Sequence, residues 1–118
     1  MSHQRFAAAV ETLIGEGPVK QRLANAYSAY LADVAESNLP PGLRREFAEL
    51  QAAINRVAPV GSETRVRASV QKMSSREAAA HAATIVKLYV ALMIGLDRAE
   101  PLKVVAPPRK PPRYLTGR

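Results

Sequence analysis

The chain of 118 residues contains no cysteine and no tryptophan, and only 5% of its residues are aromatic. Without cysteine it has no disulfide framework, no thiolate metal site and no thiol nucleophile. This composition fits a reducing compartment, so we expect a cytoplasmic protein. The shortage of aromatic residues and the many alanines favour close-packed helices over sheets, which prefer aromatic and β-branched side chains.

Catalytic motifs are also missing from the sequence. The two histidines are His3, near the N-terminus, and His81, which follows Glu77 by four residues. A Glu and a His one helical turn apart can share a proton or supply half of a metal site, but an ordinary surface contact is the better interpretation. We interpret Glu46 and Glu49 likewise as the solvated face of a helix. With no nucleophile elbow, P-loop or dinucleotide-binding pattern, we expect no enzyme, no metal and no cofactor.

Long apolar runs are scarce as well. The N-terminus lacks the basic region and apolar run of a signal peptide. The most apolar stretch, residues 82–96, is interrupted by Lys87. It is shorter than the roughly 20 residues that span a bilayer. We therefore expect no integral membrane segment.

Positive charge is concentrated near the C-terminus. Five of the 17 Lys and Arg residues lie in residues 101–118, which contain no acid, and the first 100 residues carry 12 bases against 10 acids. Five of the nine prolines also lie there, which favours an extended polyproline conformation or disorder. We predict a helical domain over residues 1–100 and a basic, proline-rich tail over residues 101–118.

Apolar residues at helical spacing predict four helices, over residues 2–14, 18–37, 41–57 and 74–98. Ser74 and Glu77 form the sequence pattern of a capping box at the start of the last one. The predicted fold class is all-α, a small bundle of about four helices with an extended basic Pro-rich C-terminal tail. The last helix is apolar over more than half its girth, so it is either covered from two sides or associates with another chain.

Residues 59–73 interrupt this helical pattern. Val66, Ala68 and Val70 alternate with polar residues at a period of two, which is typical of a strand. The sequence offers no partner strand, so the segment would lie extended against the helices or pair with a second copy. Alternation would place Arg65 and Arg67 on one side, where two guanidinium groups could bind a phosphate or a carboxylate.

Two interpretations of this basic segment remain open. Residues 56–76 carry five bases, including Lys72, against a single acid. Ser69 and the amides at the start of the last helix could add donors to an anion site. Alternatively, the two arginines pair with acids of neighbouring helices, such as Glu46 or Glu49. We favour this second interpretation, because basic runs on a surface are commonly just solvated.

The tail is a further candidate contact. Prolines would hold its cations along an extended rod that loses little entropy on docking, whether onto nucleic-acid phosphates, an acidic protein groove or an anionic membrane surface. A disordered solubilising tail is an equally good interpretation. The predicted anion- or partner-binding residues are Arg65, Arg67, Lys72, Lys103, Arg109, Lys110, Arg113 and Tyr114.

The function that these patterns favour is a non-enzymatic protein-interaction or adaptor module. It would bind a protein partner or form a homodimer through helix 74–98, while the basic tail contacts an anionic partner. The alternative is a nucleic-acid-binding accessory protein that uses the tail and the Arg65/Arg67 segment on phosphates. The nearly neutral body and the lack of a helix-turn-helix pattern disfavour it.

Overall fold

The longest element of the computed structural model is the helix α5 (Ser75–Val104), which contacts three of the other helices. The structure describes the backbone of residues 2–104 and the side chains of residues 2–95. Within that range the chain is all-α and has no strand. The elements before α5 are α1 (Ser2–Leu13), α2 (Val19–Ala26), a π-helical turn η1 (Tyr27–Leu31), a 3-10 turn η2 (Glu36–Asn38), α3 (Pro41–Ile54) and α4 (Arg65–Gln71).

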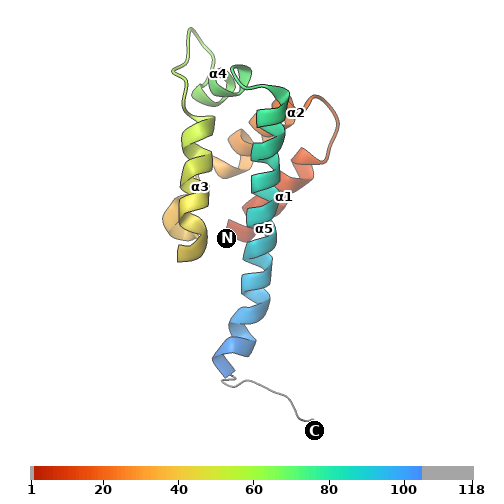
Figure 1. Cartoon of the computed structure of the whole chain (residues 1–118), viewed down its shortest axis with the longest axis vertical. Helices are drawn as coiled ribbons and strands as arrows, with labels where there is room; N and C mark the ends of the chain where they lie inside the picture. Colours follow the sequence, from red (N-terminus) through yellow and green to blue (C-terminus); the bar gives the residue numbers. More distant parts are fainter. Residues whose placement is uncertain (1, 105–118) are drawn as a thin grey trace.

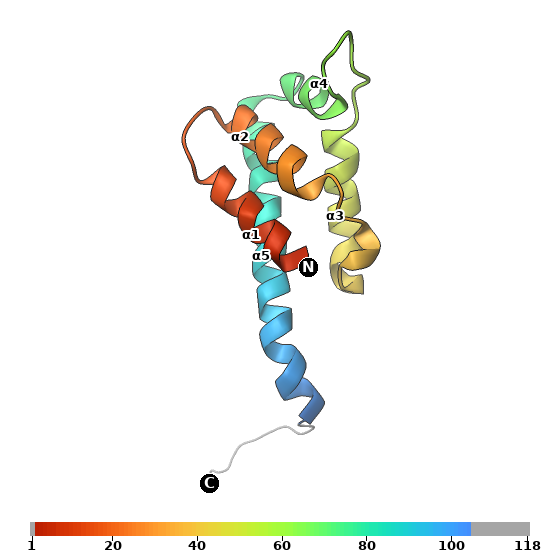
Figure 2. The ribbon, with the colours of Figure 1, turned by 180° about the vertical axis from the view of Figure 1, so that it is seen from behind.

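The other helices leave part of α5 uncovered. α1 and α2 contact each other and α5, while α3 contacts α5 and α4. Figure 1 shows α5 in front of α1 and α2, and the reverse view in Figure 2 shows α1 and α2 in front of α5. Both therefore pack on the same side of α5. The last turns of α5 extend past the ends of the other helices in both views.

A single apolar core joins the five α-helices. At its centre the fully buried rings of Phe6 and Phe47 meet edge to face, with their centroids 5.6 Å apart. This contact joins α1 to α3, which are separated in the sequence by residues 14–40. The apolar positions that helical spacing predicted for α3 and α5 include the following buried residues: Phe47, Leu50, Ile54, Ala78, Ile85 and Leu92.

The start of α5 is fixed by the predicted capping box. Oγ of Ser74 accepts a hydrogen bond from the amide of Glu77 at 3.0 Å, and Oε1 of Glu77 accepts one from the amide of Ser74 at 2.9 Å. The end of α5 differs from the prediction, because the helix continues through Pro101 to Val104. A proline removes one amide donor, and here that loss falls in the last turn of the helix.

The predicted single helix over residues 18–37 is wrong in its second half. α2 ends at Ala26, and the next turn is π-helical, with the amide of Ala32 donating to the carbonyl of Tyr27. The chain then leaves the helix, and Nε2 of Gln51 on α3 donates to the carbonyl of Val34 at 3.1 Å. Val34 stays buried after the break. Apolar spacing alone therefore did not reveal where the helix ends.

The predicted strand-like segment is the helix α4. Thr64 caps it, with its Oγ1 accepting from the amide of Arg67 at 3.1 Å. The buried residues Val66, Ser69, Val70 and Met73 follow helical spacing. Ser69 concealed this stripe in the sequence because it is polar. Its hydroxyl tolerates burial because Oγ accepts a hydrogen bond from the amide of Val57 at 2.8 Å.

The capping box makes a first prediction about stability. Replacing Ser74 with alanine (Ser74→Ala) removes the acceptor for the Glu77 amide and should lower the free energy of unfolding by about 1 kcal/mol. Urea unfolding followed by circular dichroism measures this change. Ser75→Ala removes a hydroxyl one residue later, inside α5, and serves as the control. Equal losses in the two variants would show that the cap does not stabilise the helix.

The Phe6–Phe47 contact makes a second prediction. Phe6→Leu and Phe47→Leu each keep an apolar side chain but remove one ring of the pair. A double-mutant cycle should give a coupling energy of about 0.5–1.5 kcal/mol, because edge-to-face rings attract beyond their burial. The measurement is urea unfolding of the four proteins. Additive losses would mean that the two rings contribute independently.

Candidate interaction surface

One face of α5 is apolar and exposed. Val86, Val90 and Ile94 are 37%, 48% and 47% exposed, and they lie one helical turn apart. Ala79 and Ala83 are exposed and continue the same face toward the start of the helix. We call these five residues the α5 stripe. The buried residues of α5 lie on a different side, where they contact the core.

The arrangement of the α5 stripe distinguishes it from other exposed apolar residues. Ile14 and Val60 are more exposed, at 75% and 78%, but each stands alone outside the helices. Single exposed apolar residues are ordinary in soluble proteins, whereas an aligned set marks an interaction surface more often. The α5 stripe is also free of charge, because it consists of alanine, valine and isoleucine.

The side of α5 that carries Lys87 contacts α3. Nζ of Lys87 lies 3.2 Å from Oε2 of Glu46, which joins the two helices by an ion pair. Lys87 is the single Lys, Arg, Asp or Glu between residues 78 and 95. Its charge is therefore directed toward α3 and is balanced there.

The length of α5 corrects one argument made from the sequence. Within Ser75–Gly95 an 18-residue window has a mean hydropathy of 1.6, so this part of the helix is long and apolar enough to cross a membrane, on length and composition alone. The stretch is thus longer than residues 82–96 suggested. Ile85 and Leu92 of the same stretch are buried against other helices, although only 22% of the apolar window is buried.

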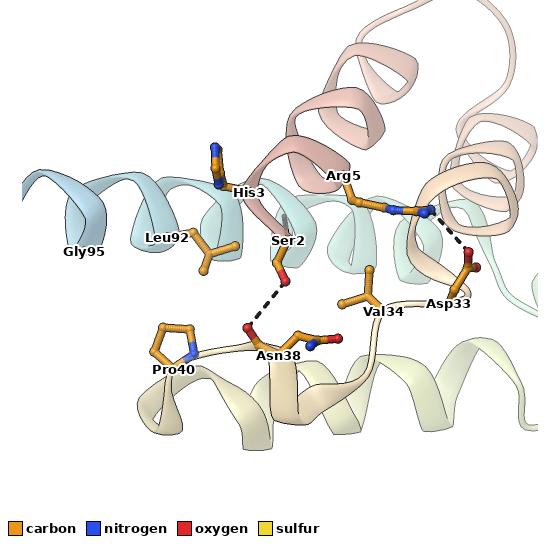
Figure 3. A pocket seen from close by; sticks show the side chains of 9 residues that line it. All are labelled: Ser2, His3, Arg5, Asp33, Val34, Asn38, Pro40, Leu92 and Gly95. Atoms are coloured by element: carbon orange, nitrogen blue, oxygen red, sulfur yellow. Dashed lines mark hydrogen bonds and ion pairs between the residues drawn. The ribbon is translucent and has the colours of Figure 1, made fainter. Parts of the chain in front are cut away.

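A groove of about 750 Å³ lies on another side of α5 (Figure 3). Its walls are the start of α1, residues 33–40 and the part of α5 around Leu92 and Gly95. Leu92 and Val34 point into the space between α5 and the 33–40 segment. The apolar side chains suit a small apolar group, and the groove is separate from the α5 stripe.

Polar contacts close the rim of this groove. Arg5 and Asp33 form an ion pair at 3.4 Å, and Oγ of Ser2 donates to the carbonyl of Asn38 at 3.4 Å. The His3 side chain also lines the groove. The charged groups here already pair with each other across α1 and the 33–40 segment. This arrangement holds the 33–40 segment against α1.

The two arginines predicted to bind an anion together do not share a side. In the helix α4, residues two apart lie on nearly opposite faces. Nη1 of Arg65 donates to the carbonyl of Asn55 at 3.3 Å, whereas Arg67 lines a small hollow beside Lys20 of α2. The joint Arg65/Arg67 site was argued from a strand, and this premise is wrong because the segment is helical.

The other donors suggested for that site are already used. Ser69 is buried and bonded to Val57, and the Glu77 amide is capped by Ser74. The alternative pairing with acids of neighbouring helices is not seen in the described part of the chain either. Glu46 pairs with Lys87, and Glu49 pairs with Arg45 at 3.4 Å.

The remaining predicted site residues are spread over the C-terminal half. Lys72 is exposed and forms the C-cap of α4. Lys103 lies in the last turn of α5, in the part whose side chains the structure does not describe. The residues of the tail, namely Arg109, Lys110, Arg113 and Tyr114, lie outside the described residues.

Metal-ligating side chains do not gather at one place within residues 2–95. No group of three or more His, Asp or Glu side chains there is placed to hold a metal ion. Glu77, which precedes His81 by one turn, directs its carboxylate to the Ser74 amide.

Comparison with known proteins yields no relative for this chain. No family model, no curated protein and no solved structure matches it. The function is therefore inferred from the residues and their arrangement.

Proposed function

We propose that the protein is a non-enzymatic interaction module of the cytoplasm that assembles, with itself or with a protein partner, through α5. The observation that carries this proposal is the α5 stripe, an uncharged apolar row along a helix whose other sides contact the core or α3. Burying each of its three large residues on assembly would contribute on the order of 1 kcal/mol, since each is about half exposed.

The basic tail supplies a second contact in this proposal. Because α5 includes residues 101–104 of the predicted tail, we call only residues 105–118 the tail from here on, and they contain Arg109, Lys110, Arg113 and Arg118 and no acid. Because α5 ends at Val104, the tail follows directly after the helix that carries the stripe. An anionic partner bound by the tail would thus be brought beside the assembly surface. The two contacts differ in physical nature, one apolar and one electrostatic, so they can be separated experimentally.

A third prediction tests the role of the stripe. Val86→Asp with Val90→Asp should abolish assembly, because burying a carboxylate without a partner costs more than the apolar contact contributes. Light scattering measures the mass in solution, which should fall to the 12.8 kDa of one chain if the protein self-associates. For a different partner, a pull-down from native lysate should lose that protein.

The matched control is Ile14→Asp with Val60→Asp, which adds two carboxylates at more exposed apolar positions away from α5. It should retain assembly and partner. Circular dichroism of both variants should show the helical content of the natural chain. If the natural protein is a monomer and captures nothing that the stripe variant loses, the proposed function is wrong.

A fourth prediction concerns the tail. A chain ending at Val104 keeps all of α5 but loses four positive charges, and it should bind a single-stranded DNA oligonucleotide at least tenfold more weakly than the full chain. Fluorescence anisotropy at 50 and 200 mM salt measures this, because phosphate contacts weaken steeply over that range. Assembly through α5 should be unchanged by truncation and by salt. Undiminished binding by the truncated chain would place the anion contact elsewhere.

A further inference from the structure

We propose that a second copy of this chain covers the α5 stripe, with the two α5 helices antiparallel and a twofold axis beside Val86. This inference rests on the proposed function and adds to it the identity of the occupant and its orientation. It starts from the distribution of side-chain sizes along the stripe. The alanines, Ala79 and Ala83, lie on one side of Val86, and the larger Val90 and Ile94 lie on the other.

The side chains of the stripe become larger from Ala79 to Ile94. Two copies of such a stripe fit each other along their whole length only when the helices are antiparallel. About an axis between residues 86 and 87, Ala79 faces Ile94 of the second copy, and Ala83 faces Val90. Each small residue then meets a large one, which lets the helices interdigitate along the whole stripe. A parallel pair would place alanine against alanine at one end and isoleucine against isoleucine at the other, so its packing would be loose at one end and crowded at the other.

Charge at the border of the stripe also fits a second copy. In the antiparallel pair, Lys87 of the two copies would flank the axis, where like charges repel. The structure places each Lys87 ammonium 3.2 Å from Glu46 of its own chain, so the charge is balanced within that chain. The stripe itself is uncharged, which suits an uncharged partner surface such as its own copy.

The shape of the molecule leaves room for this arrangement. α1 and α2 lie on the same side of α5, and the face toward the viewer in Figure 1 carries no other helix. The end of α5 extends past the other helices. In the register given above, residue 75 of an antiparallel partner would face residue 98, so the first turns of its α5 would lie along the start of this projecting end. Antiparallel helix dipoles also attract one another.

The tail of the same chain is a poorer occupant. Residues 105–118 hold four basic residues and four prolines, and only Val105, Tyr114 and Leu115 offer sizeable apolar side chains. Folding them onto the stripe would bring cations onto an uncharged surface. A bilayer suits α5 less well, because crossing it would break the Lys87–Glu46 pair and strip the buried side of α5 from the core.

Cysteine crosslinking of the full chain tests the orientation, because the natural sequence contains no cysteine. Positions 79 in an antiparallel pair are at least about 22 Å apart, whereas a disulfide needs Cα atoms within about 7 Å. Under mild oxidation Val86→Cys should form a disulfide dimer. Ala79→Cys alone and Ile94→Cys alone should not, but a mixture of the two after subunit exchange should. Val60→Cys, exposed and away from α5, gives the rate of random collision.

The outcomes separate this inference from the proposed function. Crosslinking of Ala79→Cys alone above the Val60→Cys rate would show a parallel pair, overturning the orientation while leaving assembly through α5 intact. If light scattering shows a monomer and Val86→Cys forms disulfide dimers no faster than Val60→Cys, a second copy does not cover the stripe. The pull-down with the stripe variant then decides whether another protein binds there. Flotation of the natural chain with anionic lipid vesicles, without crosslinking, would assign the stripe to a membrane and overturn the inference. If Val86→Cys unfolds, mixed Ala83→Cys and Val90→Cys test the same register.

Discussion

The packing of α5 is the constraint on which the rest of this structure depends. Three short or medium helices must bury their apolar faces, and each does so partly against α5. Isolated helices of this length are marginal in water, so their stability comes from that shared contact. α5 is consequently apolar on several sides, and the other helices cover only part of this apolar surface. The α5 stripe is the remainder of this apolar surface, and no other element in the described part of the chain covers it.

Polar side chains decide where the segments around this core begin and end. Ser74 and Glu77 start α5, Thr64 starts α4, and Gln51 binds the carbonyl of Val34 where the second helix breaks off. Each of these bonds satisfies a backbone group that the helix geometry leaves unpaired. The apolar core therefore does not specify where each helix begins or ends, and a few polar contacts set these positions. The same logic places Ser69 in the core, bonded to the Val57 amide.

Charge in this protein is divided between two kinds of role. In the described part of the chain, the ion pairs Arg5–Asp33, Arg45–Glu49 and Lys87–Glu46 are exposed and join or decorate helices, so each contributes little to stability. More than half of the net positive charge, +4 of +7, lies beyond α5, in the sequence of the tail. This separation is why we assign assembly to an apolar surface and anion contact to the tail, and why salt should affect one and not the other.

The sequence by itself determined the helical class, the capping box of α5 and the core positions of α3 and α5, because apolar spacing and cap residues act within one or two turns. Tertiary structure decided the break after Leu31 and the burial of Ser69 in α4, since the bonds made there involve Gln51 and Val57, which lie 17 and 12 residues from their partners. It also decided which face of α5 stays open. The sequence of a helix that is apolar over more than half its circumference does not reveal which side the neighbouring helices will cover. The side that they leave uncovered is the candidate site.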